Sequence, residues 1–163
     1  MPRFGLTRTL TLQNGSIKTC LEIILTENEE LSDEFLNMVD PFVSHLSVTR
    51  EQTMNSQTRL MPINFMCRRG AFGRFNQLES LCVFGTVGLL DDSVFEGCTR
   101  LKYLYMGASE YVLFEKNSAI LSSLPLSEIH LNGFGIVKVG AGLQAVIDRV
   151  RQRYGEESVR YYY

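Results

Sequence analysis

The stretch Leu78-Glu-Ser-Leu81-Cys-Val83-Phe-Gly-Thr86 decides how this chain is interpreted, because its apolar pattern returns several times in the sequence. The pattern places apolar residues first, fourth and sixth in a short phrase and follows them with polar or small residues. From the best to the weakest match, copies of it start at Leu101, Leu126, Val43, Thr7 and Ser158. The alternation at the end of each phrase is typical of a strand, so we expect one short strand per phrase.

The distance between phrases varies along the chain. The first strongly apolar positions of the phrases are Leu10, Leu46, Leu81, Leu104, Ile129 and Val159. The successive spacings are therefore 36, 35, 23, 25 and 30 residues. Parallel strands that are separated by a dozen or more residues need a crossover connection, which is usually helical. We therefore expect parallel strands with helices or loops between them, in an irregular array.

From Val43 to Leu131 the chain resembles leucine-rich repeat proteins, and its Gly97-Cys98 turn is similar to the cysteine-containing, ribonuclease-inhibitor-like type. The resemblance implies an α/β fold: a short irregular solenoid of about five to six repeats. It also implies a parallel sheet on the concave face, helices or loops on the convex face, and one domain over residues 1–163. The asparagine that usually follows each strand is mostly absent, which indicates irregular turns.

Three connecting stretches are predicted to be helical, namely residues 29–39, 119–124 and 142–154. In the first, the expected buried face is made by Leu31, Phe35, Met38 and Val39. Residues 17–25 give conflicting signals. Their apolar residues fall at helical spacing, whereas Asn14-Gly15 just before them is a strong hairpin signal. We favour a helix for 17–25 and keep a second hairpin strand as the alternative.

Residues 50–73 carry the weakest pattern. Their first part is expected to be a loop, and residues 62–70 a strand outside the repeat register. The basic cluster Arg68, Arg69 and Arg74 admits two interpretations, a phosphate or RNA contact or a solvated loop that forms salt bridges. We favour the second interpretation, because the chain as a whole has a net charge of −2 and a pI of about 5.7. That charge does not favour nucleic acid or an anionic membrane as the main partner.

Neither a transmembrane stretch nor a secretion signal is visible in the sequence, so we expect an intracellular protein, cytoplasmic or nuclear. The four cysteines, Cys20, Cys67, Cys82 and Cys98, form no C-x-x-C pair. We therefore expect no metal, no cofactor and no obligatory disulfide. Phosphate-binding and dinucleotide-binding glycine motifs are absent, and the two histidines have no partner at a known catalytic spacing, so we expect no enzymatic activity.

Side chains alternate between the two faces of a strand, which predicts two columns on the exposed face of the sheet. The first column is Thr11, Ser47, Cys82, Tyr105, His130 and Arg160. The second column is Gln13, Thr49, Phe84, Gly107, Asn132 and Tyr162. Clustered aromatic residues beside His and Arg are typical of interface hot spots. The alternative is that Phe84 and Tyr105 are covered by another segment of the same chain.

The function that we expect is a non-enzymatic protein–protein interaction through the concave sheet. The residues expected to bind the partner are Thr49, Phe84, Tyr103, Tyr105, His130, Asn132, Arg160 and Tyr162. The alternative is a small structural subunit of a larger assembly, such as a ubiquitin-ligase adaptor complex or a ribonucleoprotein. Neither end of the array carries a polar cap, so we expect either a longer chain or a partner that contacts the C-terminal strand edge.

Overall fold

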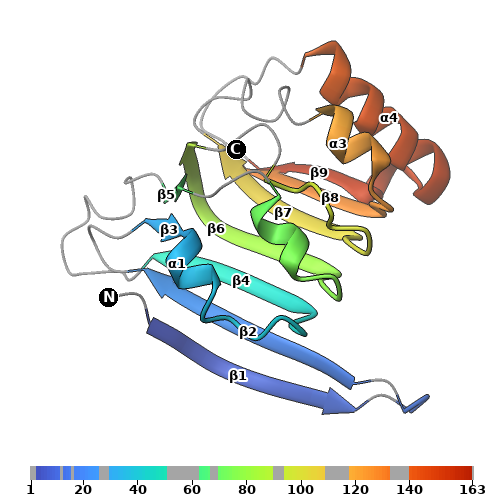
Figure 1. Ribbon diagram of the computed structural model, residues 1–163. Coiled ribbons are helices and arrows are strands. Elements are labelled where there is room, and N and C mark those ends of the chain that lie inside the picture. Colours follow the sequence, from blue (N-terminus) through green and yellow to red (C-terminus); the bar gives the residue numbers. More distant parts are fainter. Residues whose placement is uncertain are drawn as a thin grey trace.

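A sheet of strands laid side by side in nearly sequential order forms the main layer of the computed structural model (Figure 1). The structure describes residues 3–11, 13–15, 17–25, 30–50, 63–66, 70–89, 94–108, 118–132 and 140–162. Within these ranges, the side chains of residues 3–11, 63–66, 84–89, 106–108, 132 and 162 are not described. The main strands are β1 (Arg3–Thr11), β2 (Ile17–Leu25), β4 (His45–Arg50), β6 (Ser80–Leu89), β7 (Tyr103–Ala108), β8 (Glu128–Asn132) and β9 (Val159–Tyr162).

The strand order in the sheet is β1-β2-β4-β6-β7-β8-β9. The six strands from β2 to β9 are parallel, and β1 pairs antiparallel with β2. Two short strands lie off this path: β3 (Leu31–Ser32) pairs with β5 (Ile63–Met66), and β5 pairs with the end of β6. The predicted α/β class with a parallel sheet is confirmed, as is a strand within residues 62–70 outside the main register, which is the shorter β5.

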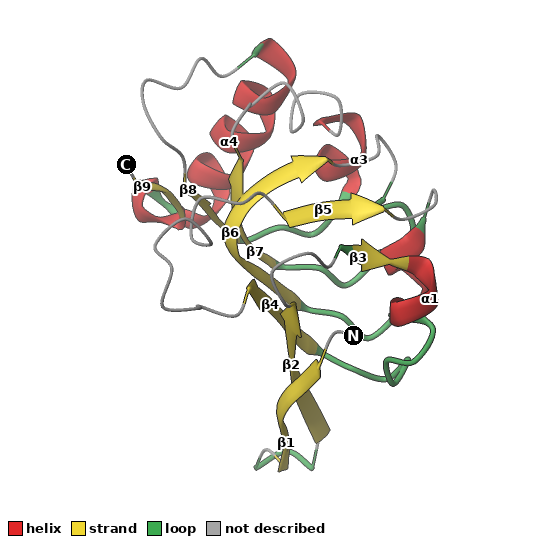
Figure 2. Cartoon of the chain, turned by 90° about the vertical axis from the view of Figure 1, so that its left-hand side faces the viewer, coloured by secondary structure: helices red, strands yellow, loops and turns green. Residues whose placement is uncertain are grey.

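The helices pack on the sheet face that carries the buried leucines (Figures 1 and 2). They are α1 (Asp33–Leu36), the 3₁₀ helix η2 (Ala71–Arg74), α3 (Ser118–Ser123), α4 (Ala141–Tyr154) and the 3₁₀ helix η3 (Glu156–Ser158). The predicted helices at 119–124 and 142–154 are thus confirmed. Ser32 caps α1 by accepting a hydrogen bond from the backbone N–H of Phe35, at 3.3 Å. Gly155 ends α4 with a φ of 99°.

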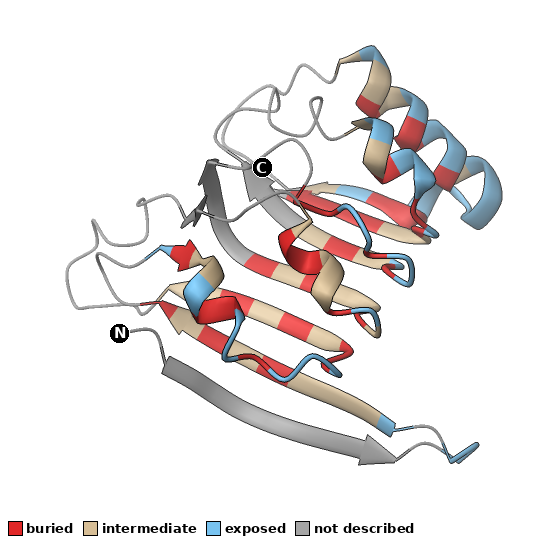
Figure 3. Ribbon diagram, in the orientation of Figure 1, coloured by how far each residue is buried: buried red, intermediate tan, exposed pale blue. Residues whose placement is uncertain are grey.

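Buried side chains repeat from one unit to the next, and we call each turn with the strand that follows it a rung. Along the strands, buried and half-buried residues alternate (Figure 3). The buried strand column contains Leu21, Leu46, Leu81, Leu104, Ile129 and Val159. The turns ahead of the strands contribute three more buried columns: Leu36, Phe72, Phe95 and Leu121; Val39, Phe75, Cys98 and Leu124; Val43, Leu78, Leu101 and Leu126. The core is therefore a set of stacked, equivalent positions.

The backbone repeats in the same way where each strand begins. The carbonyl of Ser44 accepts hydrogen bonds from the N–H groups of residues 79 and 80, at 2.8 and 3.1 Å. The carbonyl of Glu79 accepts from residues 102 and 103, and the carbonyl of Lys102 from residues 127 and 128. We call this series the strand-start ladder. Because each carbonyl has two lone pairs, one acceptor joins two donors of the next rung and fixes the distance between neighbours.

Two glycines bring the turns of neighbouring rungs into direct backbone contact. A Cβ atom placed on Gly73 would lie 2.4 Å from the carbonyl oxygen of Glu96. Gly97 has a φ of 92°, which disfavours other residues, and a Cβ placed there would lie 3.0 Å from the Cα of Gly73. Next to this contact the rings of Phe72 and Phe95 stack with centroids 6.1 Å apart. Small residues here allow large aromatic side chains to fill the core alongside.

Three predictions at the start of the chain are wrong. Residues 17–25 form strand β2 and not a helix, so the Asn14-Gly15 hairpin signal prevails. The phrase around Leu10 is consequently antiparallel, and Leu21 occupies its expected place beside Leu46. The helix predicted at 29–39 is only the single turn α1, and Met38 is 52% exposed. The short β3 takes up the residues just before that turn, since Leu31 pairs with β5.

Candidate functional site

The face of the sheet opposite the helices carries the polar and aromatic side chains that alternate with the core leucines, and we call it the open face. Its register is continuous over five strands in one row and over six in the next. One row across the sheet is Cys20, His45, Ser80, Tyr103 and Glu128. The next row is Glu22, Ser47, Cys82, Tyr105, His130 and Arg160. From Ser47 to Arg160 this second row is the column predicted from sequence, with Glu22 in place of Thr11.

Two tyrosines of β7 and a histidine of β8 form an aromatic cluster on the open face. The ring centroid of His130 lies 5.2 Å from that of Tyr103 and 5.9 Å from that of Tyr105. On the other side of His130, its Nε2 is 2.8 Å from Oε1 of Glu128. These neighbours leave His130 only 6% exposed, whereas both tyrosines remain half-buried. We call Tyr103, Tyr105 and His130 the aromatic cluster.

Beside the aromatic cluster the open face is hollowed. A shallow hollow of about 310 Å³ extends over β2, β4 and β6. Short side chains leave this space, because the row positions next to the tyrosines are Ser80 and Cys82. The remaining lining residues are Cys20, Leu21, Glu22, His45, Leu46 and Ser47. The open face is therefore uneven, with an aromatic cluster beside a hollow, and a partner of complementary shape could bind to it.

His45 lies at the edge of the hollow, and the hydrogen bonds of its neighbour Ser44 determine its tautomer. Ser44 donates its only hydroxyl hydrogen to the carbonyl of Thr19, at 3.0 Å, and lies 2.9 Å from Nδ1 of His45. Nδ1 must therefore donate to Ser44, which leaves Nε2 as the hydrogen-bond acceptor of the neutral ring. Burial lowers the pKa of His45 below its ordinary value of 6.5; nearby Lys18 adds to this effect, and Glu79 opposes it.

An ion pair flanks His45 at the end of the hollow. Lys18 Nζ and Glu79 Oε2 lie 2.5 Å apart, and each side chain is 23% exposed. The hydrogen bond from Lys18 holds the pKa of the Glu79 carboxyl below its ordinary value. Since β2 carries Lys18 and Glu79 directly precedes β6, the pair spans β4 and ties the hairpin to the central rungs.

The thiol on the open face is a weak nucleophile. Burial raises the pKa of the Cys82 thiol, and the Ser80 hydroxyl, 3.8 Å away, only partly offsets this effect. A thiol with a raised pKa is little ionised at neutral pH, and the thiolate is the reactive form. The described side chains also contain no group of three or more His, Cys, Asp or Glu that could hold a metal ion.

The structure brings together part of the predicted binding set. Tyr103, Tyr105 and His130 are in contact, and Arg160 lies beside His130 in register. His130 was expected to be exposed; that expectation is wrong, because the tyrosine rings and Glu128 cover it. Arg160 is exposed at the rim, with an ion pair to Glu157 at 3.8 Å.

The second predicted column is only partly continuous. Thr49 pairs with Phe84, and Asn132 pairs with Gly107 and Tyr162. Gly107, however, lies opposite Thr86 rather than Phe84, because the register shifts between Cys82 and Thr86. Gln13 lies outside the sheet, in the turn after β1. The side chains of Phe84, Asn132 and Tyr162 lie outside the part that the structure describes.

Sequence reasoning missed Cys20 and Glu22 as residues of the open face. Both lie on β2, which was expected to be a helix. Two signals could have found them: the Asn14-Gly15 turn, and the alternation of Leu21 and Ile23 with the more polar Cys20 and Glu22. The structure shows the contacts of one member of the predicted basic cluster, Arg74. Arg74 bonds to Asp33 Oδ1 at 3.0 Å and to Asn37, which favours the salt-bridge interpretation, whereas Arg68 and Arg69 lie outside the described residues.

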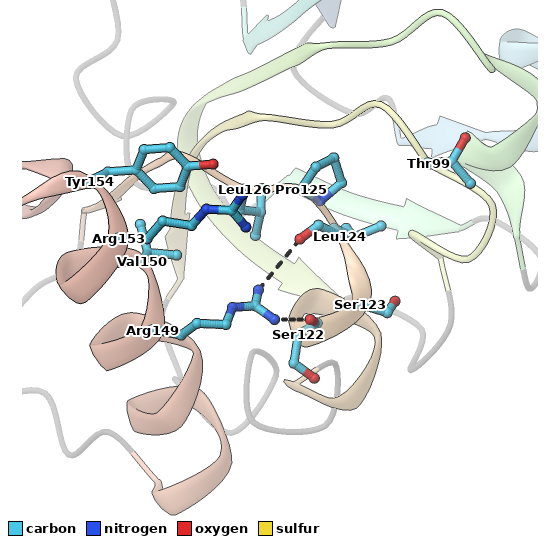
Figure 4. A pocket seen from close by; sticks show the side chains of 10 residues that line it. All are labelled: Thr99, Ser122, Ser123, Leu124, Pro125, Leu126, Arg149, Val150, Arg153 and Tyr154. Atoms are coloured by element: carbon cyan, nitrogen blue, oxygen red, sulfur yellow. Dashed lines mark hydrogen bonds between the residues drawn. The ribbon is translucent and has the colours of Figure 1, made fainter.

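A second pocket lies on the opposite side of the sheet, between α3 and α4 (Figure 4). It has a volume of about 420 Å³. Arg149 reaches from α4 to the C-terminal end of α3, where its guanidinium donates to the carbonyls of Ser122, Leu121 and Leu124. Since the last carbonyls of a helix have no intrahelical donors, this contact satisfies them and joins the two helices.

Comparisons with known protein families, curated proteins and solved structures return no match to this chain. In the part of the chain that the structure describes, every helix is too short or too polar to span a lipid bilayer. The function is therefore inferred from the geometry of the chain itself.

Proposed function

We propose that this chain is a short leucine-rich-repeat arc that binds a protein partner through its open face and has no enzymatic activity. Three features support the repeat class: the sequential parallel strands, the stacked core columns and the strand-start ladder. In a repeat of this kind each unit contacts its neighbours, and the row of strands forms an extended binding surface. The raised pKa of the Cys82 thiol supports a binding role over nucleophilic catalysis at this face.

The observation that carries the proposal is the aromatic cluster beside the hollow. Tyrosine is enriched in interface hot spots, because it offers a large contact area with few rotatable bonds. Packing of both tyrosines against His130, which Glu128 holds, limits their motion before a partner binds. Restricting side chains in advance reduces the entropy lost on association. A partner that inserts a side chain into the hollow would also cover both tyrosines.

The first experiment identifies the partner and then measures the contribution of the cluster. The tagged chain is used for affinity purification with mass spectrometry, and the isolated complex is reconstituted from purified components. Calorimetry then compares the wild type with Tyr103→Ala/Tyr105→Ala. We expect a loss of about 2 kcal/mol or more in binding free energy. Phe42→Ala is the matched control, because Phe42 is 69% exposed and precedes β4 on a turn away from the open face.

A folded double variant that binds the partner as tightly as the wild type would remove the aromatic cluster from the interface. Circular dichroism and the melting temperature of the variant show whether it is folded. Equal losses in the double variant and in Phe42→Ala would indicate a general effect of aromatic truncation rather than a site.

The second candidate is a structural subunit that a neighbour holds through a strand edge. The observation that favours it is the position of β9, which ends the strand order and pairs with β8 alone among the described strands. Unpaired backbone groups on such an edge can pair with another chain. Hydrogen exchange in the presence of the partner separates the candidates: protection of β9 supports edge pairing, and protection of β7 and β8 without β9 supports the open face.

A further inference from the structure

The pocket between α3 and α4 has the size of a small-ligand site. Its volume of about 420 Å³ falls within the range of roughly 300–1,000 Å³ that is usual for such sites. The pocket is lined by Thr99, Ser122, Ser123, Leu124, Pro125, Leu126, Arg149, Val150, Arg153 and Tyr154. None of these residues is acidic, and two are arginines one helical turn apart. Figure 4 shows both arginines and Tyr154 extending from the same helix.

Two acids among the described residues of this region interact with other side chains. Asp148 accepts a hydrogen bond from Gln144 at 2.8 Å, and Glu156 lies 3.6 Å from Nε of Arg151. The carbonyl oxygens at the end of α3 could repel an anion, but Arg149 bonds to them. The pocket therefore presents positive charge in a chain whose net charge is −2. Such a local reversal of sign favours an anionic ligand.

Some hydrogen-bond donors in the pocket lining already bind a protein acceptor, and others do not use their N–H or O–H groups in the contacts described. Ser122 and Ser123 donate their hydroxyl hydrogens to carbonyls within α3, at 2.9 and 2.7 Å. Arg153 has its guanidinium 5.6 Å from the ring centroid of Tyr154, a contact that uses the ring face and not the N–H groups. The fork of Arg153 and the phenol of Tyr154 are thus the donors best placed to bind a ligand, with Arg149 contributing charge.

We infer that this pocket binds a phosphomonoester. Two guanidinium groups without a carboxylate match a group that carries a charge of about −1.5 to −2, whereas a carboxylate carries only one charge. The planar fork of Arg153 suits two phosphoryl oxygens, and the phenol suits the third. The ligand is either a small phosphorylated metabolite or a phosphorylated side chain of a protein, which share this chemistry. The inference does not depend on the open face, which lies on the other side of the sheet.

The test is calorimetry of the purified full chain with O-phosphoserine, with serine, and with a short peptide that contains one phosphoserine, at low and constant ionic strength. We expect phosphoserine to bind and serine not to bind. Arg153→Gln should weaken phosphoserine binding by about tenfold or more. The substitution removes a bidentate hydrogen bond from a charged donor, which is stronger than a hydrogen bond between neutral groups. Arg100→Gln removes the same charge from a turn where the guanidinium faces Gln77, so it should leave the affinity unchanged.

The two ligand sources separate in the same measurement. Tighter binding of the phosphopeptide than of phosphoserine, by about tenfold or more, assigns the site to a phosphorylated protein. Equal affinities assign it to a small metabolite. The inference is wrong if neither ligand binds, or if folded Arg153→Gln binds as the wild type does. Should Arg153→Gln not fold, Tyr154→Phe removes the phenol alone and must still weaken binding.

Discussion

The hairpin β1–β2 and the central rungs β6–β8 contribute strands to one sheet but are stabilised differently. In the hairpin, the chain reverses over residues 13–15, and the two strands pair antiparallel through the register from Thr7 to Thr11. In the central rungs, every strand pairs parallel and is preceded by a turn whose three apolar side chains are buried. The pairing of β1 thus depends on the local hairpin, whereas β2 and the rungs also depend on contacts with the neighbouring parallel strands.

This difference indicates where a single substitution should lower the free energy of unfolding most. A residue of a central turn contacts the equivalent residue of the next turn, as Phe72 stacks on Phe95. Ile17, at the start of β2, is 65% exposed and lies outside the core, whereas Ile23 and Leu25 further along the same strand are buried. We therefore expect large effects in the central turns and a small effect at the exposed start of β2.

The largest effect is expected from Phe72→Ala. Phe72 is fully buried and lies 6.3 Å from the Phe75 ring and 6.1 Å from the Phe95 ring, measured between centroids. Truncating a buried phenylalanine costs about 3–5 kcal/mol of unfolding free energy through lost transfer energy and a cavity. Ile17→Ala in the hairpin should change it by less than about 0.5 kcal/mol. Urea unfolding followed by circular dichroism measures both, and equal losses would contradict the distinction between the regions.

Two glycine substitutions test the same comparison at the backbone. Gly73→Ala should cost about 1–3 kcal/mol, because the new Cβ meets the backbone of Glu96 and the turns must separate. Gly15→Ala should cost about 1–2 kcal/mol for a different reason, namely its φ of 82°, since a Cβ there meets nothing within 4 Å.

Asparagine distinguishes the two causes. It tolerates the left-handed conformation, so Gly15→Asn should recover part of the stability that Gly15→Ala loses. Gly73→Asn should be no better than Gly73→Ala, because both add the clashing Cβ. Thermal melting of the four variants decides the matter, and recovery at residue 73 would show that contact between the turns is not the constraint.

A pH effect is expected at the seam between the hairpin and the rungs, where Lys18, His45 and Glu79 meet. The pKa of His45 is lower in the folded chain than its ordinary 6.5, so its contribution is present above 6.5 and is lost as pH falls below that value. The pKa of Glu79 is also lowered, from 4.5, so its contribution is lost at still lower pH. The free energy of unfolding should therefore decline in two stages upon acidification.

Variants assign each stage to a residue. His45→Gln should remove the decline that begins near pH 6.5, and Glu79→Gln should remove the part below pH 4.5. Glu157→Gln is the control, because the Glu157 side chain is 92% exposed. Urea unfolding at a series of pH values provides the measurement, and an unchanged profile in His45→Gln would show that another group causes the first stage.

Thiol labelling should show the smallest effect on the free energy of unfolding. It should nevertheless show a large difference between the modification rates of two cysteines. Cys98 is fully buried in a central turn, and burial raises its pKa to about 12. Cys20 is half-buried on β2 of the hairpin. In a Cys67→Ser/Cys82→Ser background at pH 8, iodoacetamide should modify Cys20 in the folded chain and Cys98 only after unfolding. Equal rates without denaturant, followed by mass spectrometry, would show that the central turn opens as readily as the hairpin.

The central rungs could be predicted from sequence because their core positions recur at a near-constant spacing. Leu81, Leu104 and Ile129 lie in register as expected. Strand direction could not be predicted in the same way. A strand shows the same alternation whether it is parallel or antiparallel, so the phrase around Leu10 resembles a rung although it pairs as a hairpin. The two-residue signal Asn14-Gly15 determines the direction, against a helical spacing that points the other way.

The open face could be predicted only where it follows from alternation. Tyr103 and Tyr105 were placed on the open face correctly, because side chains two residues apart share a face. The burial of His130 depends on rings that come from a strand about 25 residues earlier and on Glu128, and no local pattern encodes it. The register shift between Cys82 and Thr86 is likewise a property of two paired strands, and it displaces Gly107 from its expected neighbour.

The strand-start ladder has a consequence for how this surface can evolve. The hydrogen bonds that join Ser44, Glu79 and Lys102 to the following rungs use only main-chain atoms, so any residue except proline can supply the donor N–H groups. Residues on the open face can then be exchanged while the spacing between units stays constant. Under the proposed function, such a scaffold would allow the contact residues to vary while the shape of the sheet is kept.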